Sequence, residues 1–107
     1  MINSQKQIRH LKLCFLFFVL MTNIHLTFSQ QIVSGKVTSI KGEPLPGVNI
    51  TVKGKSQGIV TDFDGEYSIL VNPEDILAFS YIGYLSIEEQ VDKRSVIDVI
   101  LKESSEE

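Results

Sequence analysis

The sequence has no tryptophan, one cysteine and two histidines in 107 residues. Cys14, His10 and His25 all precede residue 30, so residues 30–107 contain neither cysteine nor histidine. This absence excludes disulfides, zinc sites that use cysteine or histidine, cysteine nucleophiles and a Ser-His-Asp triad from that part. No Walker A or GxGxxG pattern occurs either. We therefore expect no catalytic residue, no metal and no cofactor.

Basic residues are also scarce after residue 29. Seven of the ten basic residues remain there against all thirteen acidic ones, which leaves a net charge of −6. An acidic chain is a poor nucleic-acid binder, because phosphate contacts need clustered Lys and Arg. The acidic surface serves either solubility or docking on a basic partner.

Residues 1–29 have the layout of a cleavable signal peptide. They begin with three basic residues, Lys6, Arg9 and Lys12. Nine apolar residues without a charge follow at Leu13–Met21, and a short polar stretch ends at Ser29. We predict cleavage between Ser29 and Gln30. The apolar run is shorter than the ~20 residues of a membrane span. Cys14 lies inside that run and not at the cut, which argues against lipoprotein processing.

The exported part reads as all-β. It has ten Ile and nine Val but one Ala and no Met, a composition that favours strands over helices. Ile50 and Phe79 are expected to point inward. Residues 30–102 are predicted to form one β-sandwich, and residues 103–107 an acidic, disordered tail, with the polar stretch beginning at Lys102. The seven expected strands are Gln31–Ser39, residues 48–53, Ile59–Thr61, Glu66–Val71, Ile76–Tyr81 (a central strand), Tyr84–Val91 and Ser95–Leu101.

The segment around Gly65 carries three carboxylates at alternate positions, Asp62, Asp64 and Glu66. A calcium loop is one interpretation, because Ca²⁺ prefers oxygen ligands at such spacing. With Gly65 placed as the invariant loop glycine, however, the first and last ligand positions fall on Val60 and Val71, which cannot bind the ion. A glycosidase pair would need a sugar-binding cleft, for which so small a sandwich has little room. The sequence favours a tight β-turn.

An aromatic cluster, Phe79, Tyr81 and Tyr84, surrounds Gly83. These rings could stack on a sugar. We favour packing at the rim of the core around a bend at Gly83, with each tyrosine hydroxyl reaching a hydrogen-bond partner.

Five segments of the chain form a pattern in a fixed order: Val33–Thr38, Gly42–Val48, Val52–Gly54, Thr61–Ser68 and Phe79–Tyr84. Together they resemble the carboxypeptidase-regulatory-like domain, in the form found as the N-terminal extension of SusC/RagA-type TonB-dependent outer-membrane transporters. The resemblance covers about residues 31–102 and implies a seven-stranded, transthyretin-like (prealbumin-like) β-sandwich. The residues that carry the motifs, expected to be structural, are Gly35, Pro44, Pro46, Gly47, Gly54, Asp62, Asp64, Gly65, Tyr67, Tyr81, Gly83 and Tyr84.

The resemblance implies a non-catalytic accessory domain in the periplasm. We expect that these 107 residues transport nothing by themselves, since they contain no TonB box, plug or barrel of such a transporter. A free-standing exported module for structure or carbohydrate adhesion is the alternative. Possible partners are a transporter plug or barrel, or a periplasmic protein. We expect contact through an open edge strand or the acidic surface, with no nucleic acid and no transmembrane segment in the mature chain.

Overall fold

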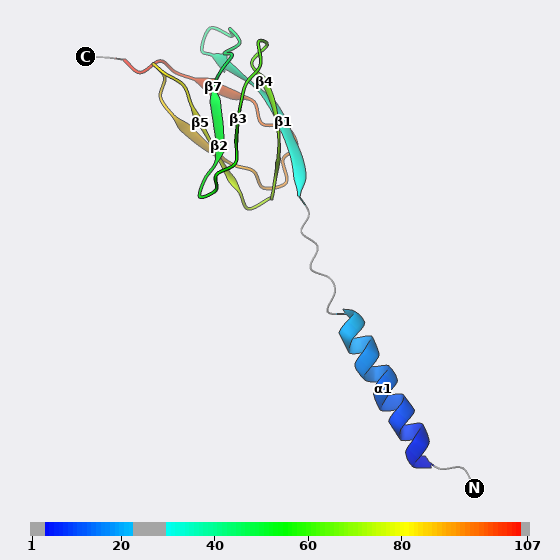
Figure 1. Ribbon diagram of the computed structural model, residues 1–107. Helices are drawn as coiled ribbons and strands as arrows, with labels where there is room; N and C mark the ends of the chain where they lie inside the picture. Colours follow the sequence, from blue (N-terminus) through cyan, green and yellow to red (C-terminus); the bar gives the residue numbers. More distant parts are fainter. Residues whose placement is uncertain (1–3, 23–29, 106–107) are drawn as a thin grey trace.

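The computed structural model describes residues 4–22 and 30–105 and has one helix followed by seven strands (Figure 1). Helix α1 (Ser4–Thr22) contains the basic start and the apolar run of the predicted signal peptide. In the described part of the chain, no helix is both long and apolar enough to cross a membrane. Ser29 lies outside the described residues, so cleavage at that position stays a prediction.

The strands confirm an all-β fold with seven strands for residues 30–105. They are β1 (Gln31–Ser39), β2 (Asn49–Val52), β3 (Gly58–Val60), β4 (Glu66–Val71), β5 (Ile76–Ser80), β6 (Ile87–Gln90) and β7 (Val99–Leu101).

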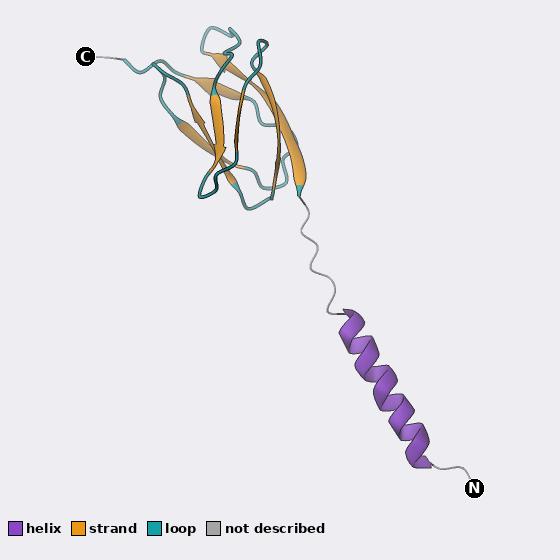
Figure 2. Cartoon of the chain, in the orientation of Figure 1, coloured by secondary structure: helices purple, strands orange, loops and turns teal. Residues whose placement is uncertain are grey.

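Two sheets pack face to face to form the sandwich (Figure 2). The smaller sheet has the strand order β4-β1-β7 and the larger one β3-β2-β5-β6. Strand β5 lies between β2 and β6, which confirms the prediction of a central strand. Strands β1 and β4 pair antiparallel, whereas β1 and β7 run parallel.

The core is built from alternate side chains of the strands, because successive side chains of a strand point to opposite faces of the sheet. In β4, for example, Tyr67, Ile69 and Val71 are buried and the residues between them are exposed. Ile50 and Phe79 are fully buried, as predicted. The buried apolar residues are Val33, Val37, Leu45, Val48, Ile50, Val52, Tyr67, Ile69, Val71, Leu77, Phe79, Val91, Ile97, Val99 and Leu101.

Four strands are shorter than predicted; β2 and β5 differ by one residue at an end or at each end, and the last two strands differ by more. The expected strand Ser95–Leu101 is regular only from Val99 onward. Before that point, the amide of Lys36 donates to the carboxylate of Asp98 instead of to a backbone carbonyl, which interrupts the ladder with β1. The expected strand Tyr84–Val91 is regular only over Ile87–Gln90, because Tyr84 and Leu85, after a bend at Gly83 with a φ of 87°, pair with the chain after β7 and not with β5.

The prediction of a disordered tail over residues 103–107 is wrong for Glu103 and Ser104. Glu103 forms an antiparallel bridge with Tyr84, and the amide of Ser104 donates to the carbonyl of Gly83 at 2.9 Å. The carbonyl of Lys102 accepts a hydrogen bond from the amide of Leu85 at 2.8 Å. Strand β7 belongs to the smaller sheet and β6 to the larger one. The segment that follows β7 therefore pairs with the segment that precedes β6. Residues 106 and 107 lie outside the described part.

Candidate functional site

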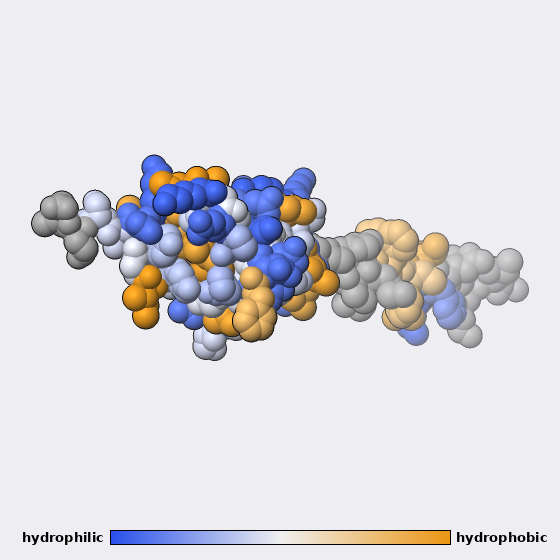
Figure 3. Space-filling model, turned by 90° about the horizontal axis from the view of Figure 1, so that it is seen from above, coloured by the Kyte–Doolittle hydropathy of each residue, from blue (hydrophilic) through white to orange (hydrophobic). Residues whose placement is uncertain are grey.

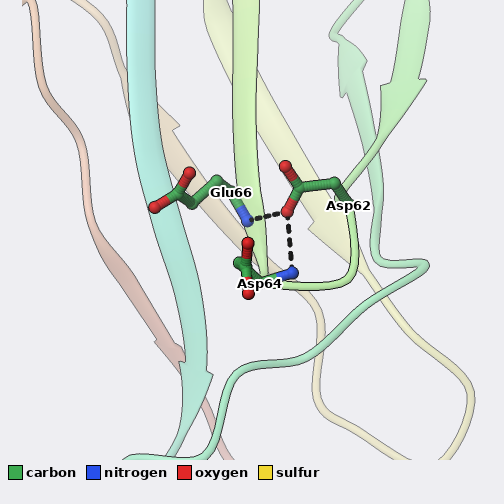
Figure 4. Close-up of side chains that lie close together, drawn as sticks. All are labelled: Asp62, Asp64 and Glu66. Atoms are coloured by element: carbon green, nitrogen blue, oxygen red, sulfur yellow. Dashed lines mark hydrogen bonds between the residues drawn. The ribbon is translucent and has the colours of Figure 1, made fainter.

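The three carboxylates form a compact acidic turn at one end of the sandwich (Figure 4). One carboxylate oxygen of Asp62 accepts hydrogen bonds from the amides of Asp64 and Glu66, both at 2.9 Å. The amide of Asp62 donates to the carbonyl of Glu66, and the amide of Gly65 donates to the carbonyl of Asp62, each at 2.9 Å. Asp62 thus organises the turn, in the way that aspartate side chains commonly do.

Gly65 allows this turn to pack closely on its neighbours. Its φ of 75° lies in the left-handed region. A Cβ atom at this position would come within 2.6 Å of the carbonyl oxygen of Val37. Any other residue would therefore be strained in φ and would also collide with the β1 backbone.

The acidic turn brings together carboxylate oxygens such as a cation site uses, but one of these oxygens is already hydrogen-bonded to the backbone. Carboxylate oxygens of Asp62, Asp64 and Glu66 lie within 4.8 Å of one another, and all three residues are exposed. However, one of the Asp62 oxygens is already engaged by two backbone amides. Because exposed acidic groups are well hydrated, the cluster by itself indicates a negatively charged surface.

A second group of motif residues, Gly35 and Tyr67, lies where β1 is flanked by β4 on one side and by the chain before β7 on the other. The hydroxyl of Tyr67 donates to the carbonyl of Ile97 at 2.7 Å. At Gly35, a Cβ atom would lie only 1.9 Å from the same carbonyl oxygen. Burial, followed by the negative charge of Asp98, raises the pKa of Tyr67 to about 12. This tyrosine is therefore a neutral hydrogen-bond donor at physiological pH.

The motif prolines Pro44 and Pro46 lie in the connection between β1 and β2. Leu45 between them is buried, and its amide donates to the carbonyl of Val37 at 3.0 Å. Gly47 and Gly54 adopt left-handed φ angles of 82° and 79°.

Tyr81 and Tyr84 pack against each other at the bend. Their ring centroids are 5.4 Å apart with the ring planes tilted by 40°, and both side chains are half-buried against the core. Neither hydroxyl makes a hydrogen bond among the described residues, so the expectation of a partner for each hydroxyl is wrong.

Sequence reasoning missed two buried polar side chains. The hydroxyl of Thr61 donates to the carbonyl of Leu45 at 2.6 Å and accepts from the amide of Val48 at 3.0 Å. The carboxylate of Asp75, 8% exposed, accepts from the amide of Asn72 at 2.9 Å and pairs with Lys55 at 3.0 Å. The partners Leu45, Val48 and Lys55 lie 13 to 20 residues away along the chain, so no local pattern pointed to either burial.

Asp75 is held as an anion by its surroundings. Burial raises the pKa of its carboxyl group, but the hydrogen bond from the Asn72 amide and the ammonium group of Lys55 outweigh burial and leave the pKa below the ordinary value. Both partners come from loops near the same end of the sandwich. The Asp75 carboxylate therefore links the loop that contains Lys55 to the loop that contains Asn72.

Comparison with curated proteins finds TonB-dependent receptors. The chain is 45% identical over 75 residues to TonB-dependent receptor P39 of Formosa agariphila, which covers 69% of this chain and 7% of the relative. It is 39% identical over 101 residues to TonB-dependent receptor P3 of the same organism, covering 92% of this chain and 10% of that protein. It is 42% identical over 80 residues to TonB-dependent receptor SusC of Bacteroides thetaiotaomicron, covering 74% of this chain and 8% of the relative. The chain thus spans about a tenth or less of their length.

Among solved structures, the sandwich is similar to a chain in a type II cohesin–X-dockerin complex from Acetivibrio cellulolyticus. The TM-score is 0.52 at 15% identity, with 66% of this chain and 56% of the other covered. At that identity the similarity concerns the fold alone.

A family model provides the assignment. The model of the CarboxypepD_reg-like domain matches residues 33–107, which include both sheets except the first two residues of β1. The match also includes the acidic turn, Gly35, Tyr67 and the tyrosine pair. The chain therefore belongs to the CarboxypepD_reg-like domain family.

Proposed function

We propose that this chain is a non-catalytic accessory domain of a SusC-like TonB-dependent receptor, exported to the periplasm and acting through contacts with other proteins. The observation that carries the proposal is the 39–46% identity between its sandwich and segments of four TonB-dependent receptors. The basic start and apolar run of residues 1–29 support export and removal of that segment after Ser29.

The side chains of the sandwich support a role without chemistry. The motif residues engage one another: Asp62 bonds to its own turn, and Tyr67 bonds to Ile97. Over residues 30–107 there is no histidine or cysteine to act as a nucleophile or base. Binding to another macromolecule remains as the activity that such a module supports.

The test is the size and location of the native protein. An antibody against residues 30–107 would be used on fractionated cells of the source organism. Because this chain spans 7–10% of its relatives, the proposal expects an outer-membrane species roughly ten times longer than the chain. A small soluble periplasmic species would overturn the receptor assignment and favour the free-standing module. Amino-terminal sequencing that does not begin at Gln30 would contradict the predicted cleavage.

A further inference from the structure

Strands β3 and β4 follow each other in the chain but belong to different sheets. The acidic turn joins them, and no ladder forms between them. Each is the edge strand of its sheet, so the two edges border an opening in one side of the sandwich. An open groove of about 440 Å³ lies there, lined by Ser34, Ile59, Val60, Asp62, Glu66, Tyr67 and Ser68.

The outer edge of β4 has backbone groups that face this groove. At its first residue, the amide and carbonyl of Glu66 are both bonded to Asp62. At its other end, the carbonyl of Leu70 accepts a hydrogen bond of 2.7 Å from the side-chain amide of Gln57. Alternate residues of a strand direct their backbone groups to the same side. The amide and carbonyl of Ser68, midway between these two, therefore point outward as well.

Ser68 is the unprotected centre of this edge. Within residues 30–105, neither strand pairing nor a side chain supplies a partner for its backbone groups, so they are free for a ligand. The side-chain amide of Gln57 donates to the Leu70 carbonyl, and it thereby takes the place that a peptide N–H of an added strand would occupy.

The other sheet edges are shorter or covered. Strand β4 has six residues, whereas β3 and β7 have three each and β6 has four. The edge of β6 is covered by Arg94, whose guanidinium bonds to the carbonyl of Gln90 and pairs with Glu89. Natural sandwiches commonly shorten or cover their edges to prevent pairing, and the middle of β4 lacks both protections.

Apolar side chains flank the open edge. Ile32 and Leu70 are cross-strand partners on the outer face of the smaller sheet and are 63% and 46% exposed. Across the groove, Val60 is exposed on β3. In Figure 3, which shows the molecule from above, hydrophobic residues lie in separate groups among hydrophilic ones. The two exposed apolar side chains beside the strand edge, Ile32 and Leu70, suit a narrow ligand with alternate apolar side chains better than a broad apolar partner.

The charge of the groove is acidic at the end near the turn. Asp64 and Glu66 are exposed there, and neither side chain has a salt bridge in the described part of the chain. A ligand with a basic side chain at that end would therefore be attracted.

We propose that the outer edge of β4 binds an extended peptide segment of a partner protein by strand addition. The peptide forms main-chain hydrogen bonds with Ser68, places alternate apolar side chains against Ile32 and Leu70, and sets a basic residue beside Asp64 and Glu66. The proposal specifies the surface of the interaction role proposed above and rests on that role. It does not rest on the receptor assignment, so the fractionation experiment and the experiment below can fail separately.

The test selects phage-displayed random short peptides on the full chain and maps the bound peptide by amide hydrogen exchange. We expect selected sequences to alternate apolar residues and to carry Lys or Arg at one end. They should slow the exchange of the Ser68 amide. Failure to select any peptide, or protection confined to loops or to other strands, would overturn the proposal.

Variants at one position separate the backbone from the side chain. Ser68→Pro removes the outward N–H and should weaken binding of the selected peptide by about tenfold or more, as expected when main-chain pairing is lost. Ser68→Ala keeps the N–H and should bind like the parent chain. Equal losses in both variants would contradict main-chain pairing. Circular dichroism verifies that each variant is folded.

A variant that strengthens binding keeps the test independent of any folding defect. Gln57→Ala removes the side chain that occupies the Leu70 carbonyl, so the peptide should bind about threefold more tightly, in line with one freed hydrogen bond. Asp64→Lys should weaken binding several-fold at low salt and much less at high salt, because the attraction is screened. Weaker binding by Gln57→Ala would contradict the proposed placement.

Discussion

The hydroxyl of Tyr67 on β4 donates a 2.7 Å hydrogen bond to the carbonyl of Ile97, directly beside the position where Gly35 of β1 lacks a side chain. These three residues join β4, β1 and the chain before β7. The hydrogen bond links the two outer parts of the smaller sheet across β1, in a part of the chain that has no cysteine for a disulfide.

Tyr67→Phe should destabilise the domain by about 1–3 kcal/mol, because the buried Ile97 carbonyl loses its hydroxyl donor. Denaturant unfolding measures the change. Tyr84→Phe is the matched control, since the Tyr84 hydroxyl makes no hydrogen bond among the described residues, and it should change stability by less than about 0.5 kcal/mol. Equal effects of the two variants would contradict the role given to Tyr67.

The same tyrosine predicts a loss of stability in alkali. Its pKa is about 12 in the fold against an ordinary value of 10.0, so the folded state binds the proton more tightly. Stability is fully present below pH ~10 and falls as the pH rises towards ~12, by roughly 3 kcal/mol in total. Unfolding titrations of the parent and of Tyr67→Phe should differ in slope over this interval. Parallel curves would show that the tyrosine is not responsible.

Gly35→Ala should cost about 3 kcal/mol or more, since the new Cβ would lie 1.9 Å from a backbone oxygen that cannot move alone. Gly42→Ala provides the comparison. A Cβ atom at Gly42 would meet no other atom within 4 Å. The substitution there should cost only the ~1 kcal/mol of placing alanine at a left-handed φ of 82°. Thermal unfolding of both variants gives the order. A Gly35 variant as stable as the Gly42 variant would contradict the close approach.

Asp62→Ala should destabilise the domain by about 1–2 kcal/mol, because two backbone amides lose their charged acceptor. Asp64→Ala removes a neighbouring carboxylate that makes no such bond and should change stability by no more than about 0.5 kcal/mol. Chemical denaturation of the two variants distinguishes an organised turn from a general effect of negative charge. A larger loss for Asp64→Ala would refute the assignment.

Asp75 predicts a loss of stability in acid. Its pKa lies below the ordinary value in the fold, so its contribution is present above pH ~4 and is lost as the pH falls through the lower pKa of the folded state. Asp75→Asn should flatten this part of the stability profile, measured by urea unfolding between pH ~2 and ~6. If the variant kept the slope of the parent, another carboxylate would be the cause.

Local patterns were enough to predict the strands. The alternation of Tyr67, Ile69 and Val71 with polar residues identifies β4 and its inward face, because successive side chains of a strand point to opposite sides. The acidic turn was equally visible, since Asp62 and Gly65 adopt it through bonds within five residues. Strand ends were less predictable: β7 shortens because Asp98 replaces a backbone acceptor for Lys36, a residue 62 positions away.

The sequence by itself determined that this chain begins with basic residues followed by an apolar run, that residues 30–107 have no thiol or imidazole, and that seven segments there form strands. These follow from composition and from periods of a few residues. The tertiary structure alone decided that β3 and β4 separate into different sheets, that Gly35 meets Ile97, and that the tail after Lys102 pairs with the chain beside Tyr84. Such contacts join residues distant in the chain, and their energies depend on how both sheets pack around one core.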